Sequence, residues 1–146
     1  MTLQHWLSEQ RLRAHKTSKE EIRNLLSKVE RDLEDAAIVD LSTDRRFMIA
    51  YDGALTLATI PLYCEGYETR GKGQHWLTFK LLPEIIGNEF SDLANYLDQY
   101  RTKRNISAYD RTGQISLAEL DELLREVQQF RDRLLLWLHE SHPGLI

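Results

Sequence analysis

The sequence has little of several features that define large classes of protein. Cys64 is the only cysteine among 146 residues, which excludes an internal disulfide and favours a reducing compartment. No apolar run approaches the roughly 20 residues that a membrane-spanning helix needs. The first residues, MTLQHWLSEQRLRAHK, are too charged and interrupted for a secretory signal. These absences predict a cytoplasmic protein that makes no membrane contact.

Excess positive charge is also missing. The chain has 19 Lys and Arg residues against 23 Asp and Glu residues, for a net charge of -4. Proteins that coat duplex DNA normally have a strongly basic surface, so we expect no duplex-DNA coating, and any nucleic-acid contact must be local. The length is that of one domain, which we place at 1–146 with its core at about 18–139.

The alternation of apolar and polar residues that is typical of β-strands is absent too, and the apolar residues repeat with helical spacing. Pro61 should kink or end the second helix, and Gly66 is a natural cap beyond it. Short connections between four main helices predict an all-α fold, an antiparallel four-helix bundle with an extra short helix and a Gly-rich loop. The predicted helices begin near residues 18, 43, 75, 88 or 91, and 116.

Two of these helix starts have the sequence of a capping box. Ser18 is followed three residues later by Glu21, and Ser116 is followed in the same way by Glu119. In this arrangement the hydroxyl oxygen and the carboxylate each accept a hydrogen bond from a backbone amide that the helix leaves unpaired. Both positions are therefore predicted helix N-termini.

The stretch EGYETRGKGQHW, residues 65–76, nearly matches a phosphate-binding loop. Gly66, four further residues, Gly71 and Lys72 fit the G-x-x-x-x-G-K part, but Gly73 stands where Ser or Thr should bind magnesium. The segment before the loop also reads as a helix, whereas such a loop follows a strand. We therefore reject a triphosphate loop.

Two interpretations of this loop remain. It is either a flexible connection whose Arg70 and Lys72 are solvated, or a local cationic surface formed by Arg70, Lys72 and His75 beside another motif.

That other motif is a basic helix end about thirty residues downstream. The stretch YRTKRNISAYDR, residues 100–111, has four basic residues and one acidic residue, and such a surplus attracts phosphate esters. Arginine adds a planar fork that fits two phosphate oxygens. The basic residues are Arg101, Lys103, Arg104 and Arg111.

Spacing refines the geometry of this motif. Arg101, Asn105 and Tyr109 follow at intervals of four and share one face if the helix continues. Arg104 and Tyr109 are five apart, which is about 140° around a regular helix. They converge only if the helix ends between them or if two subunits combine. The alternative is that Arg101 and Arg104 form surface salt bridges and that Tyr109 packs.

These residues resemble a known family. Arg104 and Asn105 followed by Tyr109 resemble the signature helix end of HEPN domains, and residues 51–55 with 66–75 resemble the central helix and loop of some members. The resemblance covers roughly residues 43–138. It implies an antiparallel helical bundle, frequent dimerisation and a cleft that handles nucleotides or RNA. Many members belong to toxin–antitoxin, phage-defence or nucleotidyltransferase-associated modules.

One departure from the family bears on activity. Ribonuclease members have His where this sequence has Tyr109, and no His occurs between Arg104 and His139. Imidazole can accept or donate a proton near neutral pH, whereas a phenol with a pKa near 10 is a poor base. A tyrosine can still form hydrogen bonds and stack on a base. Tyr109 in place of His therefore favours binding over cleavage.

The first hypothesis is accordingly a nucleotide- or RNA-binding module that works with a partner such as a nucleotidyltransferase or an antitoxin. Tyr109 could itself be the residue that a partner nucleotidyltransferase modifies. We expect a homodimer, and the resemblance implies neither a cofactor nor a metal. The predicted binding residues are Arg70, Lys72, His75, Arg101, Arg104, Asn105 and Tyr109.

Two other hypotheses remain open. In a metal-independent endoribonuclease, Arg104 would stabilise the phosphorane, Asn105 would orient it, and Tyr109 or His75 would transfer protons. The third hypothesis is a structural dimeric partner whose arginines perform no chemistry.

Other conspicuous residues have ordinary interpretations. His139 and His142 have helical metal-ligand spacing, but no third ligand is evident. Arg131 lies in an apolar stripe and is expected to be ion-paired, and Cys64 is expected to be a small buried hydrophobe. The tryptophans Trp6, Trp76 and Trp137 are expected to be core or interface anchors.

Overall fold

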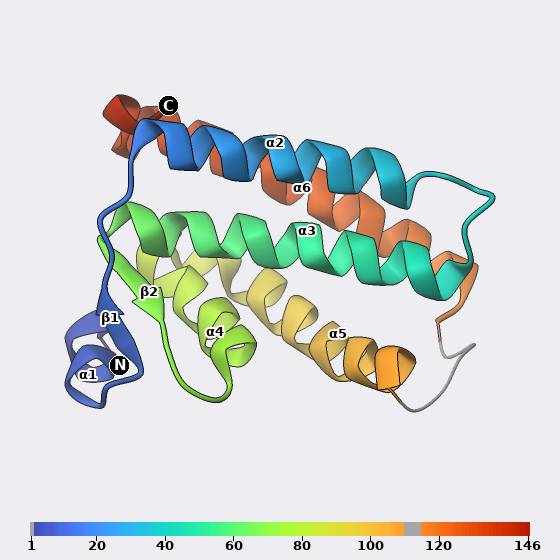
Figure 1. The fold of residues 1–146 in the computed structure, drawn as a ribbon, viewed down its shortest axis with the longest axis horizontal. Helices are drawn as coiled ribbons and strands as arrows, with labels where there is room; N and C mark the ends of the chain where they lie inside the picture. The colour runs from blue at the N-terminus through green and yellow to red at the C-terminus, as the bar shows by residue number, and fades with distance from the viewer. Residues whose placement is uncertain (1, 110–114) are drawn as a thin grey trace.

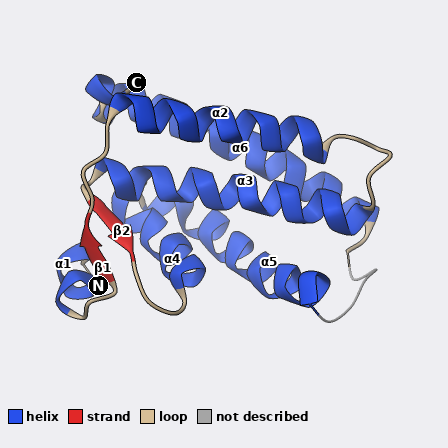
Figure 2. Cartoon of the chain, viewed as in Figure 1, coloured by secondary structure: helices blue, strands red, loops and turns tan. Residues whose placement is uncertain are grey.

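The computed structural model describes the backbone of residues 2–109 and 115–146 and the side chains of residues 2–103 and 115–146. In these ranges the chain forms six α-helices, two short strands and two single-turn 3₁₀ helices (Figure 2). The predicted all-α class is therefore confirmed, although the two strands were not expected.

Five helices form the body of the molecule. In Figure 1, α2 and α5 run from left to right, whereas α3 and α6 run back in the opposite direction. The central helix, α3, packs against α2, α4, α5 and α6. The bounds are α2 Lys19–Ala36, α3 Thr43–Cys64, α4 Gln74–Ile86, α5 Ser91–Tyr109 and α6 Leu117–Ser141, with the 3₁₀ turns η1 at Asn88–Phe90 and η2 at Pro143–Leu145.

The central place of α3 follows from its composition. Asp52 is its only charged residue beyond Phe47, and small residues such as Ala50, Ala54 and Ala58 are buried where other helices approach closely. By length and composition α3 could also cross a membrane, contrary to our expectation from the sequence, but most of that stretch is buried inside the fold. A core helix has this pattern.

The two predicted capping boxes differ. Ser116 and Glu119 form the complete reciprocal pair at the start of α6. Ser18 accepts a bond from the amide of Glu21 at 3.1 Å, but the Glu21 carboxylate turns away from the helix to His15 at 2.7 Å. The capping box at Ser18 is thus only half formed, because the Glu21 carboxylate instead ties the N-terminal segment to α2.

The predicted end of the second helix, near Pro61 and Gly66, agrees with α3, which continues through Pro61 and ends at Cys64. The amide of Glu65 still bonds the carbonyl of Pro61 at 3.1 Å. Gly66 then has a φ of 93°, a left-handed conformation that glycine adopts without steric cost. The predicted cap at Gly66 agrees with this geometry.

The N-terminal segment adds a small structure that the sequence did not predict. Helix α1, Leu3–Ser8, leads into strand β1, Leu12–Ala14, which pairs antiparallel with β2, Tyr67–Thr69. Figure 1 shows this unit at one end of the molecule, beside the start of α4. A second hydrophobic core lies under it and contains Trp6, Leu12, Leu62, Leu77 and Leu81.

Candidate functional site

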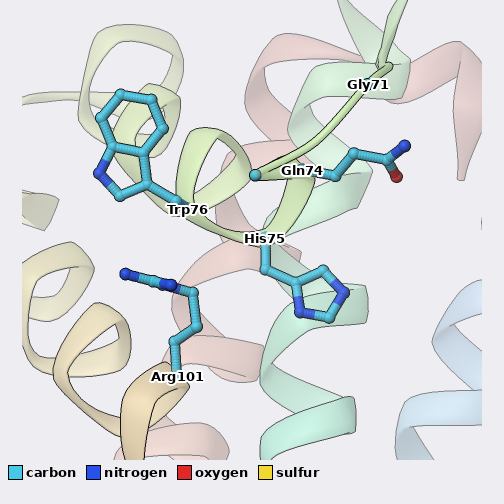
Figure 3. Close-up of a pocket in the computed structure, with 6 residues that line it drawn as sticks. Gly71, Gln74, His75, Trp76 and Arg101 are labelled. Carbon is cyan, nitrogen blue, oxygen red and sulfur yellow. The ribbon is translucent and has the colours of Figure 1, made fainter. Parts of the chain in front are cut away.

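A pocket of about 380 Å³ lies where the glycine loop enters α4 and faces the middle of α5. The loop and the first turn of α4 form one wall, and Arg101 reaches in from α5. In Figure 3, the Trp76 indole and the Arg101 guanidinium lie on one side of the α4 start, and the His75 imidazole lies on the other. The lining residues are Gly71, Gly73, Gln74, His75, Trp76 and Arg101.

The loop that forms this wall requires glycine at two positions. Gly71 has a φ of 82° and Gly73 a φ of 75°, both in the region that other residues rarely adopt. The stretch of residues 65–76 directly follows α3, which ends at Cys64, so our expectation that a helix precedes it is confirmed. Three of the four residues between Gly66 and Gly71 lie in β2 and pair with β1, so their amides cannot converge on phosphates as a triphosphate loop requires.

Arg11 holds the loop in place from the N-terminal segment. Its Nη2 donates to the carbonyl of Lys72 at 3.0 Å, and its own carbonyl accepts from the amide of Arg70 at 2.9 Å. A Cβ built on Gly73 would lie 3.2 Å from this Nη2. Sequence reasoning missed Arg11, because nothing near it in the sequence indicates a partner sixty residues away.

The start of α4 differs from the other α-helix starts at which the structure describes a cap. Gly73 supplies no side-chain cap to α4, whereas Ser42 caps α3 and Ser116 caps α6 through side-chain oxygens. The first amides of a helix bear partial positive charge and attract anions. In α4 these amides lie beside the pocket, so the backbone adds to its positive potential.

His75 is anchored from behind by the central helix. The Oη of Tyr51 lies 3.4 Å from His75 Nδ1, a long hydrogen bond, and Tyr51 is fully buried. The imidazole itself stays partly exposed and lines the pocket. His75 is thus tied to α3 through a hydrogen bond with Tyr51.

Arg101 enters the pocket as one half of an ion pair. Its Nε donates to Asp98 Oδ1 at 2.8 Å, one turn earlier on α5. Lys103 pairs with Glu119 of α6, and this contact raises the pKa of Lys103 and lowers that of Glu119. The expected surplus of positive charge is therefore partly compensated, and the salt-bridge alternative is confirmed for Arg101.

The remaining predicted residues are not all brought together. Arg70 and Lys72 are exposed on the loop and do not line the pocket. The side chains of Arg104, Asn105 and Tyr109 lie outside the described residues. The backbone of α5 nevertheless continues through Tyr109, so positions 104 and 109 differ by about 140° around its axis. Residues 110–113, DRTG, have the sequence of a turn and lie outside the described part of the chain.

The other candidates have structural partners. His142 Nε2 lies 3.3 Å from Glu65 Oε2, and Arg131 pairs with Glu30 at 3.2 Å, as expected for an arginine in an apolar stripe. Burial, followed by the charge of Glu65, raises the pKa of the Cys64 thiol to about 12. Within the described ranges, no three His, Cys, Asp or Glu side chains are grouped as metal ligands.

A scan of protein-family models and searches of curated proteins and of solved structures gave no match to this chain. The functional argument therefore rests on the pocket and on the residues that form it.

Proposed function

We propose that this chain is a HEPN-like four-helix-bundle domain that binds a phosphate-bearing ligand, a nucleotide or an RNA end, in the pocket between the glycine loop and Arg101. The observation that supports the proposal is that Arg101 and His75 line the same pocket as Gly71 and Gly73. These residues are close only in the fold, since about thirty residues separate the loop from Arg101.

The parts of the pocket match the chemistry of a phosphate ester. Asp98 takes the Nε–H of Arg101, which orients the guanidinium so that its terminal N–H groups can bind two phosphate oxygens. The start of α4 supplies backbone amides, and the His75 imidazole lines the pocket from the other side of this helix start. Gly71 and Gly73 keep the wall free of side chains, so that a ligand can approach the backbone.

The wider setting that we propose follows the HEPN resemblance. The domain would act in the cytoplasm as a homodimer, with a partner such as a nucleotidyltransferase or an antitoxin, in a prokaryotic toxin–antitoxin or defence system. Arg104, Asn105 and Tyr109 would extend the binding surface along α5, and Arg70 and Lys72 would attract the ligand from the loop.

Calorimetric titration with a 5′-phosphorylated oligouridine tests the phosphate site. We expect Arg101→Ala to weaken binding tenfold or more, because a charge-assisted bidentate contact is lost. Arg125→Ala, which removes an exposed arginine of α6, is the matched control and should bind like the wild type. Unchanged affinity in Arg101→Ala would contradict the proposal. Unchanged binding and partner activity in both Arg101→Ala and Arg104→Ala would support a purely structural dimeric partner.

A second candidate function is metal-independent RNA cleavage, which is favoured by the presence of an imidazole and a guanidinium in one pocket. Because α5 is unbroken through Tyr109, Arg104 and Tyr109 would serve one ligand only across two subunits, and His75 is the better-placed proton carrier. Mixed RNAs incubated with the protein in EDTA test this function. Cleavage that is lost in His75→Gln would support it, and intact RNA at high protein concentration would exclude it.

A further inference from the structure

A second pocket, of about 270 Å³, lies along the seam between α4 and α5. These two helices are joined through η1 and pack against one another. The residues of α4 that line this seam pocket follow one another at intervals of four and three positions. Those of α5 are also about one helical turn apart, so each set lies on one face of its helix. The lining residues are Trp76, Lys80 and Pro83 from α4, and Ser91, Ala94, Asn95 and Asp98 from α5.

The seam pocket adjoins the phosphate pocket. Trp76 lines both. The ion pair between Arg101 and Asp98 joins them as well, because Arg101 lines the phosphate pocket and Asp98 lines the seam pocket. A ligand whose phosphate lies at Arg101 therefore has the rest of its structure next to Trp76.

The Trp76 indole is held in a fixed position but is not enclosed. Trp6 packs against it in a T-shaped contact, with ring centroids 6.0 Å apart and planes at 84°. Leu77, the next residue of α4, is fully buried, whereas Trp76 is only partly buried. The earlier interpretation of Trp76 as a core anchor thus accounts for only part of its surface. An indole that is fixed and partly exposed can stack on a ligand at little entropic cost.

The chemistry of the seam pocket suits a nucleobase. An aromatic ring offers a face for stacking, and base stacking on such residues contributes to single-strand binding irrespective of base identity. Lys80 Nζ lies over the face of the Trp76 ring, 5.5 Å from its centre. A base that stacks on this face would displace the ammonium group, which would then be free to meet a second phosphate of the strand. Asn95 and Asp98 offer amide and carboxylate groups for the base edge.

We propose that the seam pocket is the base subsite of a single-stranded RNA ligand, with one base stacked on Trp76 and its 5′-phosphate at Arg101. This inference rests on the proposed function, because the phosphate pocket sets the position of the strand. The seam pocket would add recognition of a base to the recognition of the phosphate.

The test compares ligands with and without a base. Ribose 5-phosphate, uridine 5′-monophosphate and the dinucleotide pUpU are titrated calorimetrically against the wild-type protein. We expect uridine 5′-monophosphate to bind about 5- to 150-fold more tightly than ribose 5-phosphate, the range for one stacked base. The dinucleotide should bind more tightly still, and its additional affinity should fall in Lys80→Ala.

Two tryptophan variants show which side chain provides the tighter binding of the nucleotide. Trp76→Leu should reduce the difference between nucleotide and ribose phosphate to less than about threefold, and Trp137→Leu, at a partly buried position on α6, should leave it intact. Arg101→Ala should instead weaken both ligands by the same factor. Asn95→Ala replaces an exposed residue and should reduce the base-dependent gain even if Trp76→Leu does not fold.

The outcomes separate this inference from the proposed function. If wild-type protein binds ribose 5-phosphate and the nucleotide equally, or if the difference persists in Trp76→Leu, the base subsite is overturned and the phosphate site stands. If neither ligand binds, the proposed function fails and the base subsite fails with it.

Discussion

The two hydrophobic cores of this molecule differ in size and in what they support. The main core fills the space among α2, α3, α4, α5 and α6 and contains Phe47, Leu57 and Phe130, each at most 1% exposed. The small core lies between the N-terminal segment and the corner of α3 and α4. The main core holds the long helices together, whereas the small core holds the glycine loop that borders the pocket.

The residues that stabilise the long helices and those that support the proposed binding pocket therefore belong to different cores. The N-terminal segment contacts the loop through β1–β2 pairing and through Arg11, and it touches the wall of the pocket where Trp6 meets Trp76. Elements with few buried contacts open locally at lower free energy than the whole fold. We therefore expect changes in the small core to affect the pocket before they affect the bundle.

The largest effect is expected in the main core. Phe47 is fully buried, and its ring centroid lies 5.5 Å from that of Tyr100. Phe47→Ala should lower the free energy of unfolding by about 3–5 kcal/mol, because a cavity replaces the ring. Urea denaturation measures this loss, and Arg45→Ala at an exposed position of α3 is the control. A loss no greater than the control's would contradict the assignment of the main core.

A smaller and more local effect is expected for Trp6→Ala. The global free energy of unfolding should fall by about 1–2 kcal/mol, because Trp6 supports only the small core. Amide hydrogen exchange at residues 66–73 should accelerate while that of α3 stays slow. Trp6→Phe is the control, since Trp6 Nε1 is buried with no hydrogen-bond partner among the described atoms. Equal acceleration in α3 would show that the two cores are one cooperative unit.

The smallest effect is expected at the anchor that Glu21 forms with His15 and Thr17 of the N-terminal segment. Burial opposes ionisation of Glu21, but hydrogen bonds from Thr17 and His15 outweigh it and lower the pKa of Glu21. A lowered pKa in the folded state gives stability that is present above the unfolded pKa and is lost as pH falls through the folded value.

Glu21→Gln should therefore flatten the decline of unfolding free energy between about pH 5 and pH 3, by about 0.5 kcal/mol or less for so exposed a group. Urea titrations at several pH values measure the slope. Glu20→Gln, the exposed neighbour, should leave it unchanged. An unaltered slope in Glu21→Gln would mean that the anchor does not contribute to acid sensitivity.

The helices could be predicted from the sequence because their signals are local. Ser116 and Glu119 lie within one turn of each other, and apolar spacing marks the buried face of α6 without reference to the rest of the chain. The strands could not be predicted. Each has only three residues, too few to show alternation, and Leu12 meets Thr69 only through a contact far apart in sequence.

The contacts of the candidate site also divide into local ones and ones that depend on the fold. Asp98 precedes Arg101 by three residues, so their ion pair could be anticipated from helical spacing. The contact of Arg11 with the loop depends on tertiary structure and has no local signal. Trp76 was interpreted as an anchor, and only the fold shows that it borders two pockets.

The Trp6–Trp76 pair has a practical consequence. Two indoles 6.0 Å apart, one of them facing the pocket, form an intrinsic optical reporter. Their coupled transitions should give a circular-dichroism signal that Trp137, in α6, does not share. Occupancy of the pocket could then be followed in the unlabelled protein, and the same signal would register any loosening of the N-terminal segment.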